Sequence, residues 1–338
     1  MRTFDLLTTD PLLAARALRD GHLAVLPTET VYGLGARARD PRAVARVYAV
    51  KGRPADHPLI VHLPARSELD GWARDVPPYA RRLAEAFWPG PLTLVLRRGG
   101  RSGRHVTGGA DTVGLRVPDH PLTSAVLDAL ADGVAAPSAN LFGRVSPTTA
   151  QHVLDELGGL LRAGSDVVLD GGACRVGVES TIVDATGPAP RMLRPGMIGA
   201  TEVVAAGGVG LDATPSPVRA PGTLASHYSP QATVHLTEPA DLEAMTTPAS
   251  SLPGAASADG PSVGLLAPAD VATPTGVVRL SAPPSATEFA AVLYASLREA
   301  DALRLRRVLV VVPSTAAAAE ESGLADAIRD RLQRAAHR

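Results

Sequence analysis

Lysine and cysteine are nearly missing from this chain of 338 residues. Of its 33 Lys and Arg residues only Lys51 is a lysine, and Cys174 is the only cysteine. A single cysteine can form neither an internal disulfide bond nor a cysteine-based zinc site, which fits a reducing compartment. No apolar stretch approaches the ~20 residues that a membrane-spanning helix needs, and residues 1–10 lack the pattern of a secretory signal. We therefore expect a cytoplasmic protein with no membrane partner.

The chain also lacks an excess of charge of either sign, because its formal net charge is −1. A balanced charge argues against broad electrostatic attraction to nucleic acid. The Gly- and Arg-rich stretch Arg97–Arg104 is a local exception. Its simplest interpretation is a solvated hairpin tip or a mobile flap. RNA as a direct substrate is therefore disfavoured.

The composition that is present belongs to a globular protein with sizeable cores, since 45% of the residues are hydrophobic and 20% are charged. A length of 338 residues predicts two domains. Between them, 207–222 is rich in glycine and proline and has no periodicity, which is typical of a linker. We predict a first domain at 1–206, a linker or lid at 207–231 and a second domain at 232–338.

Hydrophobic periodicity predicts alternating helices and strands in both halves. In the first half we expect helices at 10–20, 41–50, 78–87, 150–157 and 201–206, strands at 22–27, 58–63, 92–96 and 112–118, and a strand with a turn at 167–172. In the second half we expect strands at 233–236, 262–267, 277–280 and 308–312, and helices at 286–302 and 323–335. The second half then forms a small three-layer domain with a mostly parallel sheet, and the run 246–261 forms a disordered loop.

Lys51 lies in the sequence Lys51-Gly52-Arg53, ahead of the apolar run 58–63. Arginine is a rigid planar fork, whereas lysine carries a compact ammonium group on a flexible stem. In a chain that uses arginine at every other basic position, the lone lysine predicts a point charge placed against phosphate. The alternative is an exposed basic loop with a lysine by chance. His62, inside the apolar run, is by default a satisfied core histidine, but here it shares a strand with the candidate phosphate loop.

Several other segments place glycine residues, hydroxyl groups or arginine side chains at predicted strand ends, where α/β sheets bind ligands. They are the turns 28–35, 134–140, 179–184 and 191–196 and the strand that contains Arg116. Ser146 precedes Pro147 and a helical run, so we expect Ser146 to cap that helix. Because a helix N-terminus favours anions, Ser146 is also a candidate phosphate contact. The ordered set of turns indicates one ligand site.

Six of these segments together resemble the YrdC/Sua5 family, the threonylcarbamoyl-AMP synthases. They are Pro27–Gly35, Lys51–Pro54, Pro58–His62, Pro137–Asn140, Ser180–Asp184 and Arg194–Gly196. Their order, the linker sequence His227-Tyr228-Ser229-Pro230 and the trailing α/β half resemble the longer, two-domain Sua5 type. The resemblance implies an α/β protein in which a YrdC-like twisted open sheet surrounds a positively charged cavity. A smaller Rossmann-like three-layer α/β Sua5 domain follows.

The resemblance also implies an activity. ATP, L-threonine and bicarbonate or CO2 become L-threonylcarbamoyl-AMP and pyrophosphate, and a tRNA threonylcarbamoyl transferase uses this product to modify the adenosine beside the anticodon. Direct tRNA binding by this chain is expected to be weak or absent. Mg²⁺ is expected to bind the ATP phosphates and water, with no protein side chain as a ligand.

The resemblance implies site residues position by position. The threonine-binding positions match Thr30, His62, Arg116, Ala136 and Ser180. The ATP-binding positions match Lys51, Arg53, His57, Thr112, Ser138, Asn140, Ser146, Arg194 and Tyr228. Lys51 and Arg53 are the catalytic candidates, which offset charge on phosphate, Arg116 holds the threonine carboxylate, and Tyr228 closes over the nucleotide. Many relatives carry asparagine where this chain has His57, and either side chain can donate one hydrogen bond.

Two other functions remain open at this stage. A carbamoyl-adenylate-forming enzyme like the YrdC-type module of hydrogenase-maturation proteins is one, but those chains are longer and carry cysteine-rich zinc motifs. The other is an RNA-binding module that uses the basic stretch 97–104. A substrate swap distinguishes the first, and tRNA binding across a salt series distinguishes the second, because binding to phosphates falls steeply with salt.

Overall fold

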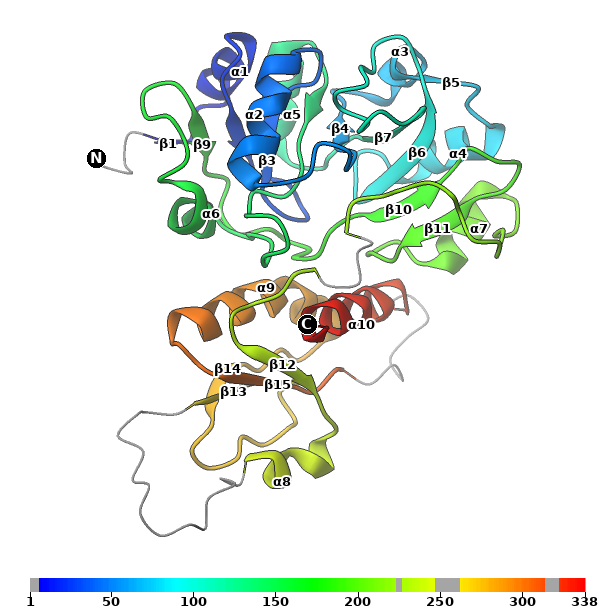
Figure 1. The fold of residues 1–338 in the computed structure, drawn as a ribbon. Coiled ribbons are helices and arrows are strands. Elements are labelled where there is room, and N and C mark those ends of the chain that lie inside the picture. The colour runs from blue at the N-terminus through cyan, green and yellow to red at the C-terminus, as the bar shows by residue number, and fades with distance from the viewer. Residues whose placement is uncertain (1–5, 223–226, 247–261, 314–321, 338) are drawn as a thin grey trace. The chain divides into compact units, whose positions relative to one another are not determined.

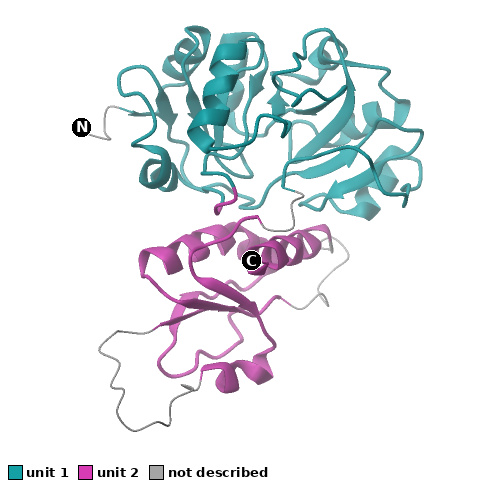
Figure 2. Cartoon of the chain, viewed as in Figure 1, with its two compact units in different colours: residues 1–142, 146–224 teal, residues 143–145, 225–338 magenta. Residues whose placement is uncertain are grey.

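The computed structural model describes residues 6–222, 227–246, 262–313 and 322–337 (Figure 1). The chain divides into two compact units, which Figure 2 distinguishes by colour. Unit 1 comprises Met1–Phe142 and Ser146–Leu224, and unit 2 comprises Gly143–Val145 and Ala225–Arg338. The limits predicted for the linker stay a prediction. The predicted disordered loop at 246–261 lies, except for Thr246, outside the described residues.

Unit 1 is built on a mixed sheet of 11 strands in the order β1-β9-β2-β3-β8-β4-β7-β6-β10-β11, with β5 paired to β6. The strands are β1 (Leu7–Thr8), β2 (Ala24–Leu26), β3 (Gly33–Arg37), β4 (Ile60–His62), β5 (Ala73–Arg74), β6 (Leu92–Arg98), β7 (Thr112–Arg116), β8 (Val134–Ala135), β9 (Val167–Leu169), β10 (Thr181–Asp184) and β11 (Arg191–Arg194). Its large open form agrees with the predicted α/β class. The prediction of a turn throughout 28–35 is wrong at its end, because β3 begins at Gly33 and buries Leu34.

Helices cover this sheet and supply its cores. They are α1 (Pro11–Arg19), α2 (Pro41–Lys51), α3 (Leu69–Trp72), α4 (Pro78–Phe87), α5 (Pro121–Leu130), α6 (Ala150–Leu157) and α7 (Ala200–Gly207), with a 3₁₀ turn η2 (Arg66–Glu68). Leu18 of α1 and Leu127 of α5 pack on Leu26 and Leu169 in one core. Helix α5 was not predicted from the sequence.

The ends of α2 place the candidate phosphate loop. Asp40 caps the start, because its side chain accepts hydrogen bonds from the backbone of Arg42 and Ala43. Lys51 is the last residue of the helix, and Gly52 follows with φ of 61° in the left-handed region. Glycine adopts this conformation without the cost of a Cβ. The chain can therefore turn sharply after Lys51 and lead into β4.

Unit 2 is a three-layer α/β domain with a parallel sheet in the order β12-β15-β13-β14. Its elements are β12 (Thr233–Leu236), η3 (Pro239–Asp241), α8 (Leu242–Thr246), β13 (Val263–Leu266), β14 (Val278–Ser281), α9 (Ala286–Ala302), β15 (Arg307–Val310) and α10 (Ser322–Ala336). Figure 1 shows α9 and α10 on one face of this sheet and α8 on the other. Each strand and long helix lies within two residues of its prediction, whereas η3 and α8 were missed. No helix among the described residues is long and apolar enough to cross a membrane.

Candidate functional site

One face of β4, β7, β6 and β10 carries several predicted site residues. In the parallel pair of β4 and β7, His62 lies opposite Arg116, and Ile60 lies opposite Gly114. Because side chains alternate along a strand, Thr112 and Arg116 share this face on either side of Gly114. At about 3.3 Å per residue they are roughly 13 Å apart. The face is therefore long enough for a ligand with two chemically different ends.

Arg116 is buried and held by groups from the turn after β2. Its Nη2 donates to Oγ1 of Thr30 at 2.9 Å and lies 2.7 Å from Oε1 of Glu29, which is also buried. Its Nε donates to the carbonyl of Gly90 at 3.2 Å. Within the described part of the chain Nη1 donates no hydrogen bond, so one corner of the guanidinium is open to a ligand. Thr30 is fixed in turn by Oγ1 of Thr28 at 2.8 Å.

Ser180 joins this face at the start of β10. Its Oγ lies 2.8 Å from Oγ1 of Thr93, and its carbonyl accepts from Nη2 and Nε of Arg194 at 2.9 and 3.1 Å. Gly196, two residues after Arg194, packs against the same part of β10, since a Cβ there would lie 2.3 Å from the backbone nitrogen of Thr181. The structure therefore brings together Ser180, which is predicted to bind threonine, and Arg194, which is predicted to bind the nucleotide.

His62 is buried and uncharged. Burial first, and then the charge of Arg116, lowers the pKa of His62 to about 3. Its Nδ1 is buried and has no hydrogen-bond partner among the described residues. A buried polar atom without a partner costs free energy, so His62 is better explained by a ligand than by a satisfied core.

Lys51 is buried as well, with 2% of its surface exposed. Its Nζ donates to the carbonyls of Ser138 at 2.6 Å and Asn140 at 2.5 Å. Burial, reinforced by the charge of Arg53, lowers the pKa of Lys51 to about 7, while Glu156 opposes this shift. The interpretation of Lys51 as an exposed basic residue is wrong. The lysine instead joins the end of α2 to the predicted nucleotide turn 138–140.

Arg53 and His57 lie around one aromatic ring. The guanidinium of Arg53 is centred 5.5 Å from the ring of Phe142, and its Nη2 donates to the carbonyl of Pro58 at 3.0 Å. The ring of His57 meets the same phenyl edge to face at 5.4 Å. Burial and then Arg53 lower the pKa of His57. Phe142 was not predicted, and it gives Arg53 and His57 a common support.

The remaining predicted contacts of unit 1 lie in the turns around β8 and before α6. The backbone of Ala136 donates to the carbonyl of Ile60 at 3.0 Å, and Ser138 forms an isolated bridge with Gly33. Both therefore lie beside β4 and β3. The prediction that Ser146 caps the helix is wrong, because Thr149 is the N-cap residue of α6.

Ser146 has a different partner. Its Oγ donates to Oε1 of Glu179 at 2.6 Å, and both side chains are buried. Glu179 directly precedes Ser180, so this hydrogen bond ties the turn before α6 to the start of β10. An anion site built from the N-terminus of α6 no longer explains Ser146, and its contact with ATP rests on the family resemblance alone.

Tyr228 belongs to unit 2, where it is almost fully buried. Its backbone has φ of 60°, a left-handed conformation that is unusual for a residue with a large side chain. The ring stacks on Tyr294 at 5.6 Å, and the guanidinium of Arg331 lies 5.2 Å from its centre. Residues held in such a conformation cluster at ligand clamps. Closure of Tyr228 over a nucleotide stays a prediction.

In the stretch 97–104, the side chains of Arg98, Arg101 and Arg104 have partners within the protein. Nη1 of Arg98 donates to the carbonyl of Ser102 at 2.8 Å, Arg101 is paired with Glu68, and Nη1 of Arg104 donates to the carbonyl of Gly109 at 2.9 Å. Ser102 is buried, whereas Arg97, Arg101 and Arg104 are exposed, as expected of a solvated tip. These contacts weaken the interpretation of the stretch as an RNA-binding patch.

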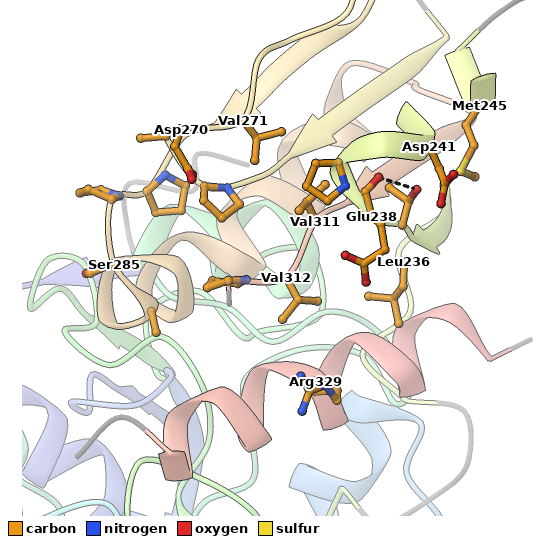
Figure 3. Close-up of a pocket in the computed structure, with 18 of the residues that line it drawn as sticks. Leu236, Glu238, Asp241, Met245, Asp270, Val271, Ser285, Val311, Val312 and Arg329 are labelled. Atoms are coloured by element: carbon orange, nitrogen blue, oxygen red, sulfur yellow. Dashed lines mark hydrogen bonds between the residues drawn. The ribbon is translucent and has the colours of Figure 1, made fainter. Parts of the chain in front are cut away.

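A hollow of about 1400 Å³ lies in unit 2 at the carboxyl ends of its parallel strands. Figure 3 shows its lining, which includes Glu238, Asp241 and Asp270 with Arg329. The position is one where α/β sheets bind ligands, but three carboxylates to one guanidinium do not suit a polyphosphate. None of the predicted site residues lines this hollow.

Three acidic or basic residues near the predicted site were not on the predicted list. Glu29 was named only as part of the turn at 28–35, although a carboxylate between two threonines was a signal for a partner of Arg116. Nothing in the sequence marked Glu179 as a site residue except its place directly before Ser180. The sequence did mark Arg219, because it is the only Asp, Glu, Lys or Arg between Asp212 and Glu238.

Comparison with known families gives two adjoining matches. Residues 16–196 match the family model Sua5_yciO_yrdC, described as telomere recombination, and residues 193–337 match a model described as the C-terminal domain of threonylcarbamoyl-AMP synthase. The threonylcarbamoyl-AMP synthase of Pyrococcus abyssi is 42% identical over 236 residues, which cover 67% of each chain. The synthase of Bacillus subtilis is 42% identical over 245 residues, which cover 70% of this chain and 69% of that one.

Solved structures agree with the fold. Sua5 of P. abyssi in complex with L-threonine superposes with a TM-score of 0.82 at 34% identity, covering 96% of this chain and 94% of that chain. A variant of the same protein gives 0.82 at 32% identity, over 98% of this chain and 95% of that chain. The predicted class, an open-sheet α/β domain followed by a smaller α/β domain, is confirmed.

Proposed function

Because the chain belongs to the YrdC/Sua5 family of threonylcarbamoyl-AMP synthases, we propose that it forms L-threonylcarbamoyl-AMP and pyrophosphate from ATP, L-threonine and bicarbonate or CO2. The observation that carries this proposal is the face shared by His62, Arg116 and Ser180, with the buried Lys51 at the neighbouring turn. It offers an amino-acid site and a phosphate site within one α/β unit. The activity is that of a nucleotidyltransferase.

The amino-acid end of the site is centred on Arg116. We assign the threonine carboxylate to the open Nη1 corner of its guanidinium, since arginine matches the planar geometry of a carboxylate. Neutral His62, with its unpartnered Nδ1, suits the threonine hydroxyl. Thr30, Ala136 and Ser180 complete this end, where the small Ala136 leaves room for the side chain.

The nucleotide end comprises the residues around the last turn of α2. Lys51, Arg53 and Arg194 supply positive charge for the phosphates, and Ser138, Asn140, Ser146, Thr112 and His57 supply polar contacts. The threonine amine adds to CO2 and loses a proton, or condenses with bicarbonate and releases water. An oxygen of the resulting carbamate attacks the α-phosphorus, and pyrophosphate leaves with the electrons of the broken P–O bond. Such a reaction depends on positioning and charge neutralisation more than on a covalent nucleophile.

Magnesium would enter with ATP as part of the substrate. Among the residues that the structure describes, no group of three or more His, Cys, Asp or Glu side chains could hold a metal ion. A Mg²⁺ ion carried by the phosphates and water needs no such group, so the donor set fits an ion that arrives with ATP. Lys51 and Arg53 would then neutralise the charge that the ion leaves uncompensated.

The labile adenylate has to reach a second enzyme that uses it. We assign this second enzyme as a tRNA threonylcarbamoyl transferase in the cytoplasm. We assign to Tyr228 the role of shielding the adenylate from water until it is released. The test is to incubate the protein with ATP, L-threonine and labelled bicarbonate and to analyse the nucleotides. Formation of a labelled adenylate only when threonine is present supports the proposal. If the label stays in bicarbonate and none enters a nucleotide, the proposal is overturned.

A further inference from the structure

The segment 212–221 of unit 1, which we call the strap, packs on the sheet face that carries Thr112. Val218 and Ala220 of the strap contact an apolar cluster formed by one residue from each of three strands, Ile60, Val95 and Ile182. These strand residues are buried. The strap is therefore part of the wall of the candidate site.

Polar contacts hold both ends of the strap. Near its start, Oγ of Ser216 donates to Oδ2 of Asp184 at 2.6 Å, and Nη2 of Arg191 pairs with Oδ2 of Asp212 at 2.5 Å. At its end, Nη1 of Arg194 donates to the carbonyl of Pro221 at 3.1 Å. The strap is thus attached to a residue that the proposed function assigns to the nucleotide.

Arg219 lies between Val218 and Ala220 and pairs with the candidate phosphate loop. Its Nη1 is 3.1 Å from Oδ2 of Asp56, and the two side chains are 73% and 62% exposed. Exposed ion pairs contribute little stability, so this pair can be exchanged for another anion at small cost. The guanidinium of Arg219 therefore lies next to Asp56 but contributes little to the stability of the fold.

Arg219 is also close to two predicted nucleotide contacts. It lines, with Thr112, a cavity of about 10 Å³ beneath the strap, room for about one water molecule. Its charge also helps to lower the pKa of His57, although burial and the charge of Arg53 lower that pKa more. Arg219 therefore adds a third cationic or imidazole group to Arg53 and His57 of the loop that follows Gly52.

We infer that Arg219 is a further ATP-binding residue, which exchanges Asp56 for the β- and γ-phosphates and holds the pyrophosphate as it leaves. This inference rests on the proposed function. The α-phosphorus must lie near the threonine carbamate, on the Arg116 side of the face, so the pyrophosphate extends toward the Thr112 end. Arg219 is at that end, and a guanidinium binds phosphate oxygens bidentately.

The test is calorimetric binding of inorganic pyrophosphate and of AMP to the full-length protein and to Arg219→Ala. We expect pyrophosphate to bind about tenfold more weakly to the variant and AMP to bind equally, because AMP lacks the β- and γ-phosphates. The KM for ATP should rise by a similar factor and the KM for threonine should not change. The difference should shrink at high salt, since exposed charges are screened.

Two further variants separate a phosphate contact from a structural latch. Arg74→Ala removes an exposed arginine that pairs with Asp75 and Asp111, and it should leave pyrophosphate binding unchanged. Asp56→Asn breaks the ion pair but keeps Arg219, and pyrophosphate should bind equally well or more tightly. If Asp56→Asn weakens binding as much as Arg219→Ala, the pair acts as a latch and the inference fails.

The inference and the proposed function fail differently. If Arg219→Ala binds pyrophosphate as tightly as the unmodified protein does, only the role of Arg219 is overturned. The same holds if its affinity for AMP falls as much as its affinity for pyrophosphate. If the unmodified protein binds neither ATP nor pyrophosphate, the proposed nucleotide site itself is wrong.

Discussion

Oε1 of Glu29 lies 2.7 Å from Nη2 of Arg116, and both side chains are buried. Glu29 also accepts a hydrogen bond from the backbone of Asp119 at 3.1 Å. The carboxylate therefore compensates the buried guanidinium before substrate arrives and fixes its orientation, which leaves Nη1 for a second carboxylate. Pre-orientation of this kind lowers the entropy that binding must offset.

Arg116→Ala should raise the KM for L-threonine by roughly 10- to 100-fold, because hydrogen bonds to charged groups contribute about 1.5–3 kcal/mol. Steady-state kinetics with threonine varied at saturating ATP measures this change. The control is Arg81→Ala, which removes an exposed arginine paired with Asp70. An unchanged threonine KM in Arg116→Ala would remove Arg116 from the amino-acid site.

Glu29→Ala should destabilise the protein by about 3–5 kcal/mol, because removing one partner of a buried ion pair leaves the other charge uncompensated. Denaturant unfolding measures the loss, and the double variant Glu29→Ala with Arg116→Met should recover part of it, since neither charge then remains. A loss below about 1 kcal/mol in Glu29→Ala would show that Glu29 does not compensate Arg116.

Lys51 should take up a proton when ATP binds near pH 8. Its pKa of about 7 means that most of the side chain is neutral at that pH, whereas phosphate favours the ammonium form and raises the pKa in the complex. ATP affinity should therefore be highest below pH 7 and fall as pH rises above it. Calorimetry in buffers of different ionisation enthalpy measures the proton uptake, and its absence at pH 8 would contradict a lysine beside phosphate.

Lys51→Arg provides a second test of the same residue. The guanidinium stays protonated, so the proton uptake should vanish. Its bulk cannot place one donor where Nζ meets two carbonyls, and turnover should fall on the order of 100-fold. Thermal unfolding recorded beside turnover distinguishes misplacement from misfolding, and near-normal turnover would defeat the argument from the lone lysine.

Tyr228→Ala should reduce turnover and release hydrolysed adenylate, because the ring that is proposed to shield the product is gone. Tyr228→Phe keeps the ring and should retain the product. The yield of intact adenylate per pyrophosphate released measures the shielding. Equal yields in Tyr228→Ala and the unmodified protein would exclude a lid at Tyr228.

The periodic elements were predictable from the sequence because their signals are local. Asp40, Pro41 and Gly52 mark both ends of α2, and the apolar pattern fixed α9 over 286–302 without error. The short strand β3 was missed because its two glycines read as a turn. Its burial depends on β2 and β8, which are distant in sequence.

The sequence predicted a set of site residues but not the contacts that they make within the protein. The lone lysine and the resemblance singled out Lys51, yet its hydrogen bonds to the carbonyls at 138 and 140 depend on how α2 meets the turn after β8. Ser146 was misassigned as a cap because the sequence Ser-Pro imitates a helix start, whereas Glu179 is its buried partner. Long-range partners of this kind leave no mark at short spacing.

The most direct measurement of the proposed function is the initial rate of pyrophosphate release from ATP, with L-threonine and bicarbonate each omitted in turn. The proposal predicts rapid release only when both are present, with one threonylcarbamoyl-AMP formed per pyrophosphate when Tyr228 is intact. Release at the same rate without threonine would contradict it, whichever residues bind the nucleotide.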